Sequence, residues 1–369
     1  MCRARHAGTA VRILLFLWLC FFPACISAGC AEPVLVEDGY TGDTRITFLG
    51  DCTLGSVYSK RNVQAGFVRT IAENGLAYPF SCLRDMTGND DLTVGNLEGV
   101  LSDRKLERVR KTYNFIGATE YTQILTDGSV ECVTLANNHT HDYGDKGYAD
   151  TKDALENAGI AWFDAENAYI WEDPRGVRIG FLGVNYSLSG NRATRYAAMA
   201  QELREKGCAC VITVMHAGDE YQLKTSAYQA QIVSLAAENG SCLVVGHHPH
   251  VVQGYAEVSG MPVVYSLGNC VFGGSIHVRD PNALVLQAVL HWESGVLQSM
   301  DLHFYPIRVT TDASYNNYCP CFLSGEAAQQ VLERMEASTG ISVGVWEDGE
   351  GAVVHVDAPD GGWGPAMAE

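Results

Sequence analysis

Short apolar runs alternate along the chain with longer stretches in which apolar residues recur at helical spacing. The short runs are rich in β-branched residues, and they predict buried strands at residues 45–49, 92–94, 132–135, 177–184, 211–215, 242–245 and 261–265. The helical spacing predicts amphipathic helices at residues 148–158, 197–206 and 228–238. This alternation predicts an α/β domain in which helices pack on a largely parallel sheet.

The pattern changes in the last third of the chain. Residues 283–292 and 296–304 predict consecutive antiparallel strands, and a helix that begins near Ser324 closes the domain. The tail is rich in Gly, Pro and Asp, a composition typical of mobile segments. We therefore expect a leader at residues 1–30, a main domain at 44–310, a helical closing segment at 311–347 and a mobile tail at 348–369.

The N-terminus predicts export. Three arginines precede an apolar run at residues 13–24, which is too short for a membrane span but has the length of a signal-peptide core. The following ISAGC resembles a bacterial lipoprotein cleavage box that ends at Cys30, although Ser27 stands where the box prefers leucine. Lipid attachment, ordinary cleavage and an uncleaved anchor stay open. Each alternative places the body outside the cytoplasm, attached to the membrane or secreted.

The net charge limits the possible ligands. The formal charge is −18, and a protein this acidic repels phosphate backbones, so we expect no nucleic-acid partner. Any anionic ligand must be bound by local cations or by a metal.

Cysteine usage predicts mostly reduced thiols. Of 13 cysteines, four lie in the leader and nine are scattered through the body, without a C-x-x-C pair. The C-x-C pairs Cys208/Cys210 and Cys319/Cys321 are either metal thiolates or buried strand residues. We favour the second, because alternate strand positions share a face and free cysteine behaves as a small hydrophobe. No disulfide framework is predicted.

Polar residues follow one predicted strand after another. Ligands of open α/β sheets bind beyond the carboxyl ends of the strands, so these residues should converge on one edge. They are Asp51, Asn96, Glu98, Asn137, Asn138, His139, His216, Glu220, His247, His248 and His250. Oxygen and nitrogen donors without cysteine suit divalent metals such as Mn, Fe or Zn, and two such ions clamp both the attacking and the leaving oxygen of a hydrolysed group.

Six ordered motifs carry a family resemblance over roughly residues 44–272: GDCTLG, GNLEG, ANNHTHDYG, HAGDEY, GHHPHVVQG and YSLGNCVF. Together they resemble the capsule-synthesis family typified by the poly-γ-glutamate protein CapA, itself similar to calcineurin-like metallophosphoesterases. The resemblance implies a four-layer α/β/β/α sandwich with a dinuclear metal site. It also implies a role in making, exporting or attaching an anionic γ-glutamyl polymer, with membrane synthase or export proteins as partners.

The resemblance assigns roles motif by motif. It implies Asp51, Glu98, Asn138, His216, His248 and His250 as metal ligands. The phosphoesterases have x-His after the first Asp, whereas Cys52 and Thr53 stand here, so one imidazole is missing. Asn96 replaces their bridging Asp, and a neutral amide offsets no metal charge, so Glu98 is the better bridging candidate.

The same motifs imply catalytic and substrate residues. His139 corresponds to the general acid or phosphate-facing donor, and Asp142 is placed to hold its tautomer. Pro249 fixes the turn that aims the last two histidines. The substrate-binding candidates are Asn96, Asn137, Arg108, Lys111, Glu220 and Asn269.

Several residues keep two interpretations. His141 is interpreted as a loop histidine rather than a ligand, and His247 is either a ligand or a partner of one. Glu220 and Tyr221 either line the cleft or begin a helix. The basic run from Arg104 to Lys111 either steers an anionic substrate or forms a solvated face.

Two function classes follow. In the first, the protein is a metal-dependent hydrolase or transferase that acts on γ-glutamyl amide, phosphoester or related bonds of a surface polymer. In the second, it is a membrane-tethered assembly factor of a capsule machine that binds polymer without turnover. The departures at Cys52, Thr53 and Asn96 favour the second class, and the retained ligand set favours the first.

Overall fold

The computed structural model describes residues 39–57, 66–185, 188, 190–312, 314–360 and 362–363. The leader and Cys30 lie outside the described residues, so export and lipid attachment stay predictions. None of the described helices has both the length and the apolar character that crossing a bilayer requires.

The larger sheet is built around β1 (Gly42–Thr53). Its strand order is β17-β16-β15-β1-β3-β6-β7, with β14 paired to β1 and β18 paired to β16. The pairs β1/β3, β3/β6 and β6/β7 are parallel, whereas β15 and β16 are antiparallel neighbours, as predicted. The strands are β3 (Leu92–Leu97), β6 (Cys132–Thr134), β7 (Ala161–Phe163), β14 (Asn269–Phe272), β15 (Asn282–Glu293), β16 (Val296–Arg308), β17 (Cys321–Phe322) and β18 (Ala352–Asp357).

The second sheet has the order β12-β13-β11-β10-β9-β8 and a parallel centre. Its strands are β8 (Tyr169–Glu172), β9 (Arg178–Asn185), β10 (Cys210–His216), β11 (Leu243–His247), β12 (Val252–Val258) and β13 (Met261–Leu267). A small third sheet joins β2 (Ser56–Val57), β5 (Phe115–Gly117) and β4 (Val100–Leu101). All predicted strands are present in one of the two large sheets.

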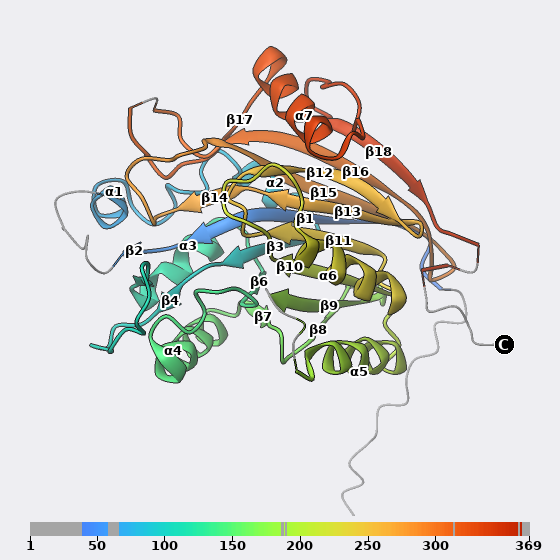
Figure 1. Cartoon of the computed structure of the whole chain (residues 1–369), viewed down its shortest axis with the longest axis horizontal. Helices are drawn as coiled ribbons and strands as arrows, with labels where there is room; N and C mark the ends of the chain where they lie inside the picture. Colours follow the sequence, from blue (N-terminus) through green and yellow to red (C-terminus); the bar gives the residue numbers. More distant parts are fainter. Residues whose placement is uncertain are drawn as a thin grey trace, which may run out of the picture. The chain divides into compact units, whose positions relative to one another are not determined.

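The two large sheets stack face to face, and helices cover their outer faces (Figure 1). Alternation along the strands explains the layers. On β1, Ile46 and Phe48 belong to the core between the sheets, whereas Leu49 packs against the helices of the first outer layer. On β9, Phe181 faces the shared core and Leu182 faces the second outer layer. The predicted four-layer α/β/β/α sandwich is therefore confirmed.

The helices divide between these layers according to the residues that they bury. The first outer layer contains α1 (Phe67–Asn74), α2 (Arg84–Thr87), the 3₁₀ turn η2 (Thr119–Tyr121), α3 (Thr122–Asp127) and α4 (Gly144–Asn157). The second contains α5 (Arg192–Glu205) and α6 (Ala227–Glu238). The predicted closing helix is α7 (Gly325–Thr339), which packs on β12 and β16 and adds Val331, Leu332 and Met335 to the core between the sheets.

The predicted mobile tail needs a correction. Residues Ala352–Asp357 form β18, which pairs with β16 along its outer edge (Figure 1). Ala352 and Val356 are buried there. The strand alternates buried and exposed positions over only six residues, and the flanking Gly, Pro and Asp dominate the composition of the segment. The composition therefore predicted a mobile segment at a place where the structure has a short strand.

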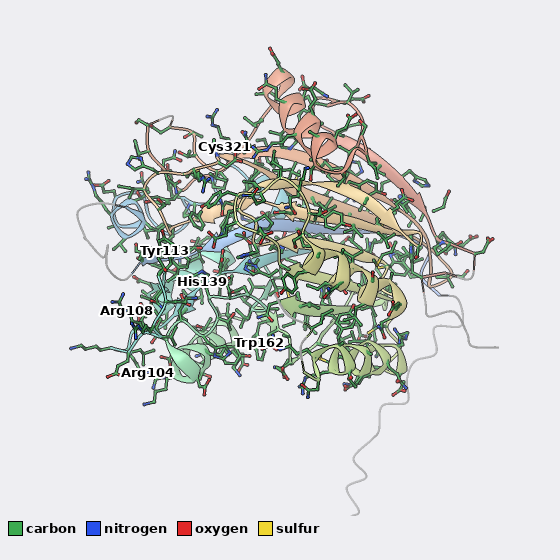
Figure 2. The ribbon with its side chains drawn as sticks, viewed as in Figure 1. Arg104, Arg108, Tyr113, His139, Trp162 and Cys321 are labelled. Carbon is green, nitrogen blue, oxygen red and sulfur yellow. A yellow bond between two sulfur atoms is a disulfide. The ribbon has the colours of Figure 1, made fainter. Side chains whose placement is uncertain are left out.

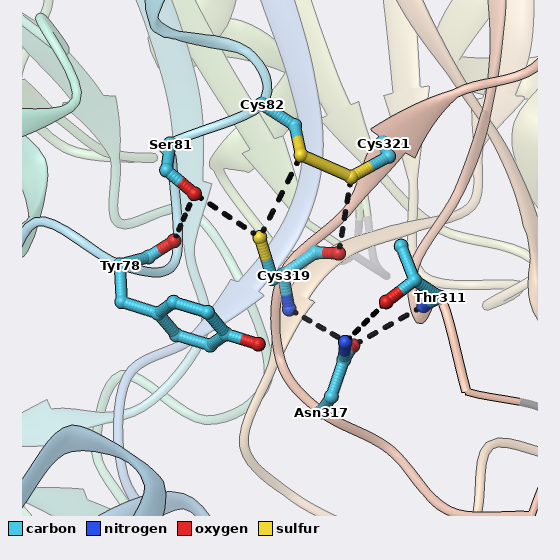
Figure 3. The surroundings of a disulfide bond; sticks show 7 residues. All are labelled: Tyr78, Ser81, Cys82, Thr311, Asn317, Cys319 and Cys321. Carbon is cyan, nitrogen blue, oxygen red and sulfur yellow. Dashed lines mark hydrogen bonds between the residues drawn. A yellow bond between two sulfur atoms is a disulfide. The ribbon is translucent and has the colours of Figure 1, made fainter. Parts of the chain in front are cut away.

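The cysteines include one pairing that the sequence did not predict. Cys82 and Cys321 form a disulfide across a sequence separation of 239 residues, and Cys319 Sγ lies 3.9 Å from Cys82 Sγ (Figure 3). The other described cysteines are free and buried, including Cys208 and Cys210. The expectation of mostly reduced thiols holds among the described residues, but the interpretation of Cys321 as a buried strand thiol is wrong.

Candidate metal centre

Strand register brings the polar motifs to one edge of the sandwich. Asp51 on β1 pairs with Asn96 on β3, and His216 on β10 pairs with His247 on β11. Gly50 precedes Asp51 because no side chain fits there: a Cβ atom would lie 2.3 Å from the carbonyl oxygen of Gly268. This close approach lets the Asp51 N–H donate to that oxygen at 2.9 Å. The two sheets therefore end in a shared polar cluster.

Asp51 is fully buried and surrounded by donors. Its Oδ1 accepts a hydrogen bond of 2.7 Å from the Asn96 amide. His247 Nδ1 lies 3.3 Å from Oδ1, and His250 Nδ1 lies 3.1 Å from Oδ2. Burial would raise the pKa of Asp51, but the contacts with His247 and His250 outweigh it and hold that pKa well below the ordinary value. Asp51 is therefore a carboxylate at neutral pH.

Glu98 is equally buried but lacks donors. Neither of its carboxylate oxygens has a hydrogen-bond partner. The nearest imidazole nitrogens, from His216, His139 and His250, lie 3.7, 3.8 and 3.9 Å from Oε1. Burial raises the pKa of Glu98 to about 8 despite the opposing field of His250. Burying an ionised carboxylate without donors is costly, so Glu98 is either protonated or compensated by a cation.

The histidines approach from the second sheet. His216 Nε2 lies 2.8 Å from Asn138 Oδ1 and 3.1 Å from His248 Nδ1. The loop after β11 holds His248 and His250 at φ values of 97° and 55°, on either side of Pro249. Left-handed backbone at non-glycine residues costs free energy and clusters at functional sites. The strain here aims two imidazoles into one cluster.

Burial and neighbouring charges separate the pKa values of these imidazoles. Burial holds the pKa of His216 well below its ordinary value and, with the field of His250, lowers that of His248 to about 3. For His250, burial acts in the same direction but is outweighed by Glu98 and Asp51, which raise its pKa to about 10. Without a cation, His216 and His248 are therefore neutral and able to donate lone pairs to a metal.

The donor set fits divalent metal ions in two overlapping groups. Glu98, His216 and His248 place one ligand atom each within 4.8 Å of one another, and so do Asp51, Glu98 and His250. Glu98 belongs to both groups, the position that a bridging carboxylate occupies. Nitrogen and oxygen donors without sulfur suit Mn, Fe or Zn. The cluster is therefore compatible with divalent metal binding.

This arrangement accompanies a similarity that covers most of the domain. Residues 45–274, more than half of the chain, match the family model described as bacterial capsule synthesis protein PGA_cap. The chain belongs to this family. The match confirms the resemblance predicted from the six motifs and connects the chain with capsule biosynthesis.

Two relatives in the family are similar over most of their length. Capsule biosynthesis protein CapA of Bacillus anthracis is 25% identical over 310 residues, which are 73% of this chain and 73% of that protein. PGA biosynthesis protein CapA of Bacillus subtilis (strain 168) is 29% identical over 304 residues, 76% of each.

Solved structures give weaker similarities. The protein TT1561 of Thermus thermophilus has a TM-score of 0.38 and 12% identity, covering 66% of this chain and 94% of that one. The 5′-nucleotidase from Candida albicans SC5314 has a TM-score of 0.41 and 12% identity, covering 75% of this chain and 53% of that one. At these TM-scores the fold assignment rests on the sheet order and core layers described above.

His139 lies at the edge of the cluster in this PGA_cap domain. Its Nδ1 lies 2.8 Å from Asp142 Oδ2, which also accepts a hydrogen bond of 2.6 Å from the Phe115 N–H. Burial lowers the pKa of His139, although Asp142 opposes the shift. Lys111 forms an ion pair with the other oxygen of Asp142 and donates to the Asn138 carbonyl at 2.8 Å. The predicted neighbours His139 and Asp142 are therefore in direct contact, a geometry that allows Asp142 to fix the His139 tautomer.

Three predicted substrate residues have other partners. Asn137 donates to Asn96 Oδ1 at 3.1 Å and to the Leu97 carbonyl at 2.8 Å, and its own Oδ1 accepts from the His139 N–H. The Asn96 amide lies against Asp51 and His216. Both amides are buried, so we reassign them from substrate binding to positioning of the cluster. Lys111, tied to Asp142 and Asn138, takes the same role.

The remaining candidates divide between the cleft and the surface. Glu220 and Asn269 line the cleft, and Asn269 Oδ1 lies 2.9 Å from His250 Nδ1. Arg108 is exposed and does not line it. His141 lies against Tyr148 with 4.7 Å between ring centroids and 3.5 Å from Asp145, in keeping with a loop histidine. His247 contacts Asp51 without entering either ligand group.

A cleft of about 280 Å³ opens onto the cluster. It is lined by the buried His139 and His250 and by the exposed Tyr113, which lies near His139 in Figure 2. Its other lining residues are Phe115, Glu220, Tyr221, Asn269, Phe272, Gly274, Ser275, His277, Val278 and Arg279. Sequence reasoning missed Tyr113, Phe115 and Arg279, because they lie outside the strand-end motifs. Tyr221, by contrast, was one of the two residues expected either to line the cleft or to begin a helix. An arginine shortly after YSLGNCVF in an acidic chain was the available signal.

Proposed function

We propose that the protein is a metal-dependent hydrolase or transferase that acts on bonds of an anionic γ-glutamyl surface polymer during capsule biosynthesis. The observation that carries the proposal is Glu98: a buried carboxylate with two unsatisfied oxygens, shared by two groups of possible ligands. Such a group is buried either in its protonated form or beside a cation, and the imidazoles around Glu98 supply the further ligands that a cation needs. The polymer class comes from the relatives, whose names place them in capsule and PGA biosynthesis.

The proposed ligands are Asp51, Glu98 and His250 for one ion and Glu98, His216 and His248 for the other. Asn138 completes the set through its Oδ1, which already faces His216. Bound divalent ions would supply Lewis acidity and would orient the reacting oxygens. Asn96 holds the carboxylate of Asp51 in position to bind an ion, and Asn137 holds the backbone of His139 beside the site.

His139 has the role of proton carrier in this proposal. Because Asp142 accepts the Nδ1 proton, Nε2 is the atom that takes up or delivers a proton in the cleft. The lowered pKa of His139 keeps the imidazole neutral at pH 7, so that it acts first as a base and then returns the proton to the leaving group. Lys111 limits the negative charge that Asp142 presents to the ring.

A second candidate function is a polymer-binding assembly factor without turnover. It is favoured by the end of β1, where Cys52 and Thr53 are buried and supply no imidazole. Metal analysis and an assay separate the two functions. The hydrolase should hold two equivalents of divalent metal and turn over a model phosphodiester or a γ-glutamyl oligomer, whereas a purified protein that binds no added Mn, Fe or Zn would leave only the binding role.

The location belongs to the proposal as well. We place the protein outside the cytoplasm, attached through Cys30 or the apolar leader and beside membrane synthase or export proteins. Cys30→Ser should release the protein from the membrane fraction if lipid is the tether. Retention of this variant at the membrane would show that the leader is the anchor instead.

A further inference from the structure

The cleft contains a cation that the proposed chemistry does not use. Arg279 is exposed, and its guanidinium carbon lies 4.2 Å from the centroid of the Tyr221 ring. Within the described part of the chain, Arg279 forms no ion pair. In a protein of formal charge −18, an arginine without a carboxylate partner at the mouth of a cleft is available for an external anion.

The platform under this guanidinium is fixed to the metal centre. The Tyr221 N–H donates to the Pro249 carbonyl at 2.7 Å, and Pro249 stands between His248 and His250. The rings of Tyr221 and His250 have centroids 5.9 Å apart. Tyr221 adopts a φ of 59°, a left-handed conformation that costs free energy in a residue with a large side chain. The fold therefore holds Tyr221 where its ring contacts both the Arg279 guanidinium and the His250 imidazole.

The loop that carries Arg279 is held from the other side. Asn316 Nδ2 donates to the carbonyls of Phe272 and Ser275, at 2.8 and 3.0 Å. Asp280, directly after Arg279, forms an ion pair with Arg334 on α7. Because both ends of the loop are anchored, the guanidinium lies at a defined place in the cleft.

The chemistry of this place favours a carboxylate. A guanidinium that stacks on an aromatic face keeps its N–H edge free, and that edge matches a carboxylate bidentately. Tyr113, Phe115 and Phe272 provide apolar wall for a methylene chain. Glu220 lines the same cleft and disfavours an anion at its own side. The cleft therefore has one place for a carboxylate, next to apolar surface.

We propose that Arg279, held on Tyr221, binds a free carboxylate of an anionic polymer, on the unit next to the bond that faces His139. In a γ-linked glutamyl chain every unit keeps such a carboxylate, so this subsite selects a polymer that bears one acid per unit over a neutral chain. The position of the bond rests on the proposed function, whereas the binding of the carboxylate does not.

The test compares two ligands and four variants of the full chain. The ligands are a γ-glutamyl oligomer of defined length and the same oligomer with its carboxylates methyl-esterified, measured by calorimetry. Hydrogen bonds to charged groups contribute about 1.5–3 kcal/mol, so Arg279→Gln should bind the acid about 10–100-fold more weakly and the ester as the wild type does. Arg279→Lys should bind the acid with an affinity between those of the wild type and Arg279→Gln, because lysine keeps the charge but lacks the planar guanidinium. Tyr221→Phe should retain binding, since the ring remains.

Arg195→Gln is the matched control. It removes the same charge from α5, where Arg195 pairs with Glu166 and lies outside the cleft. Equal weakening by Arg279→Gln and Arg195→Gln would mean a general charge effect and would overturn the subsite. Unchanged binding of the acid by Arg279→Gln, with a wild-type melting temperature, would do the same. Tight binding of inorganic polyphosphate that depends on Arg279 would replace carboxylate by phosphate as the ligand class and would overturn the proposal.

Wild-type behaviour separates this inference from the proposed function. If the wild type binds no metal and does not turn over polymer, but Arg279→Gln weakens binding of the acid, the proposed subsite stands and the proposed enzyme activity is wrong. If the wild type binds metal and turns over polymer, but binding of the acid does not depend on Arg279, the proposed enzyme activity stands and the proposed subsite is wrong.

Discussion

Two clusters of carboxylates and imidazoles within the described residues behave in opposite ways. The first, the candidate metal centre, comprises Asp51, Glu98, His216, His248 and His250. The second, which we call the outer cluster, lies on β1, β15, β16 and β18 and comprises Asp43, His291, Asp301, His355 and Asp357. The metal centre is buried, whereas the outer cluster is in contact with solvent.

In the outer cluster the charged groups satisfy one another. His291 lies 2.8 Å from Asp43 and 3.0 Å from Asp301, and His355 lies 2.6 Å from Asp301 and 3.2 Å from Asp357. For His291 these contacts outweigh burial, and for His355 the contact with Asp301 dominates, so both pKa values are raised. The cluster ties β18 to its neighbours and has no need of a cation.

In the metal centre the same residue types do not satisfy one another's hydrogen bonds and charges. Glu98 has no donor, and the pKa values of His216 and His248 are lowered, so that these imidazoles are neutral. Residue composition therefore does not distinguish a binding site from a surface network of ion pairs. Burial without mutual satisfaction does, and this distinction makes separate predictions for the two clusters.

The largest effect should come from removing a ligand. Asp51→Ala or His250→Ala should lose at least one equivalent of metal, measured by elemental analysis after dialysis. The wild type should gain about 2.7 kcal/mol of unfolding free energy at a metal concentration 100 times Kd, and these variants should gain less. Asp301→Ala in the outer cluster is the control and should retain full metal content. Equal metal loss in all three variants would remove the distinction between the clusters.

His139→Ala should affect turnover rather than metal content. General acid–base groups contribute about 10²–10⁴-fold in rate, so this variant should keep its metal and lose most of its activity toward a model phosphodiester. His355→Ala provides the matched loss of an imidazole outside the centre and should retain activity. Wild-type turnover by a metal-loaded His139→Ala would contradict the assignment and favour the binding role.

Glu98 predicts how the stability of the metal-free protein changes with pH. Its folded pKa is about 8, above the ordinary value of 4.5. The folded state therefore binds more protons than the unfolded state between these values, and stability should fall as the pH rises from about 4.5 to about 8. Glu98→Gln should flatten this fall, and added divalent metal should reverse it in the wild type only. Urea unfolding at several pH values measures all three; a flat wild-type profile would contradict the prediction.

The smallest effect should come from the outer cluster. The raised folded pKa values of His291 and His355 contribute stability that is fully present below the unfolded pKa and is lost as the pH rises through the folded values. Exposed pairs contribute at most about 1 kcal/mol, so Asp301→Asn should lower the unfolding free energy only slightly, and metal should not change this difference. Thermal melts at pH 6 and pH 8 check it. A metal-dependent shift would show that the two clusters are coupled.

Local patterns in the sequence predicted the strands and the polar edge, whereas the four layers were expected from the family resemblance. Apolar runs predicted the central strands, and the polar residues Asp51, Glu98 and His216 that follow them indicated the polar edge, since parallel strands end together. The sequence also singled out Glu98 as the bridging candidate, because an amide at Asn96 offsets no charge.

What the sequence did not predict depends on contacts between distant segments. The partners of Cys82 and of Arg279 are 239 and 58 residues away, and no local pattern identifies them. Asn137 was assigned to substrate because its motif is polar, whereas its partners are the carbonyl of Leu97 and the amide of Asn96. Hydrogen bonding of a buried amide is set by which strand lies beside it, a property of the tertiary structure.

The pairing of β1 with β15 has a consequence for the time course of folding. Arg45 pairs with Val289, so the central strand lacks its antiparallel neighbour until about 240 more residues have been made, which takes about 12–48 s at about 5–20 residues per second. During that interval an apolar strand edge is exposed, a state that favours aggregation. Non-local pairings of this kind also slow folding after release. The larger sheet therefore cannot close before the C-terminal strands β15 and β16 have been made.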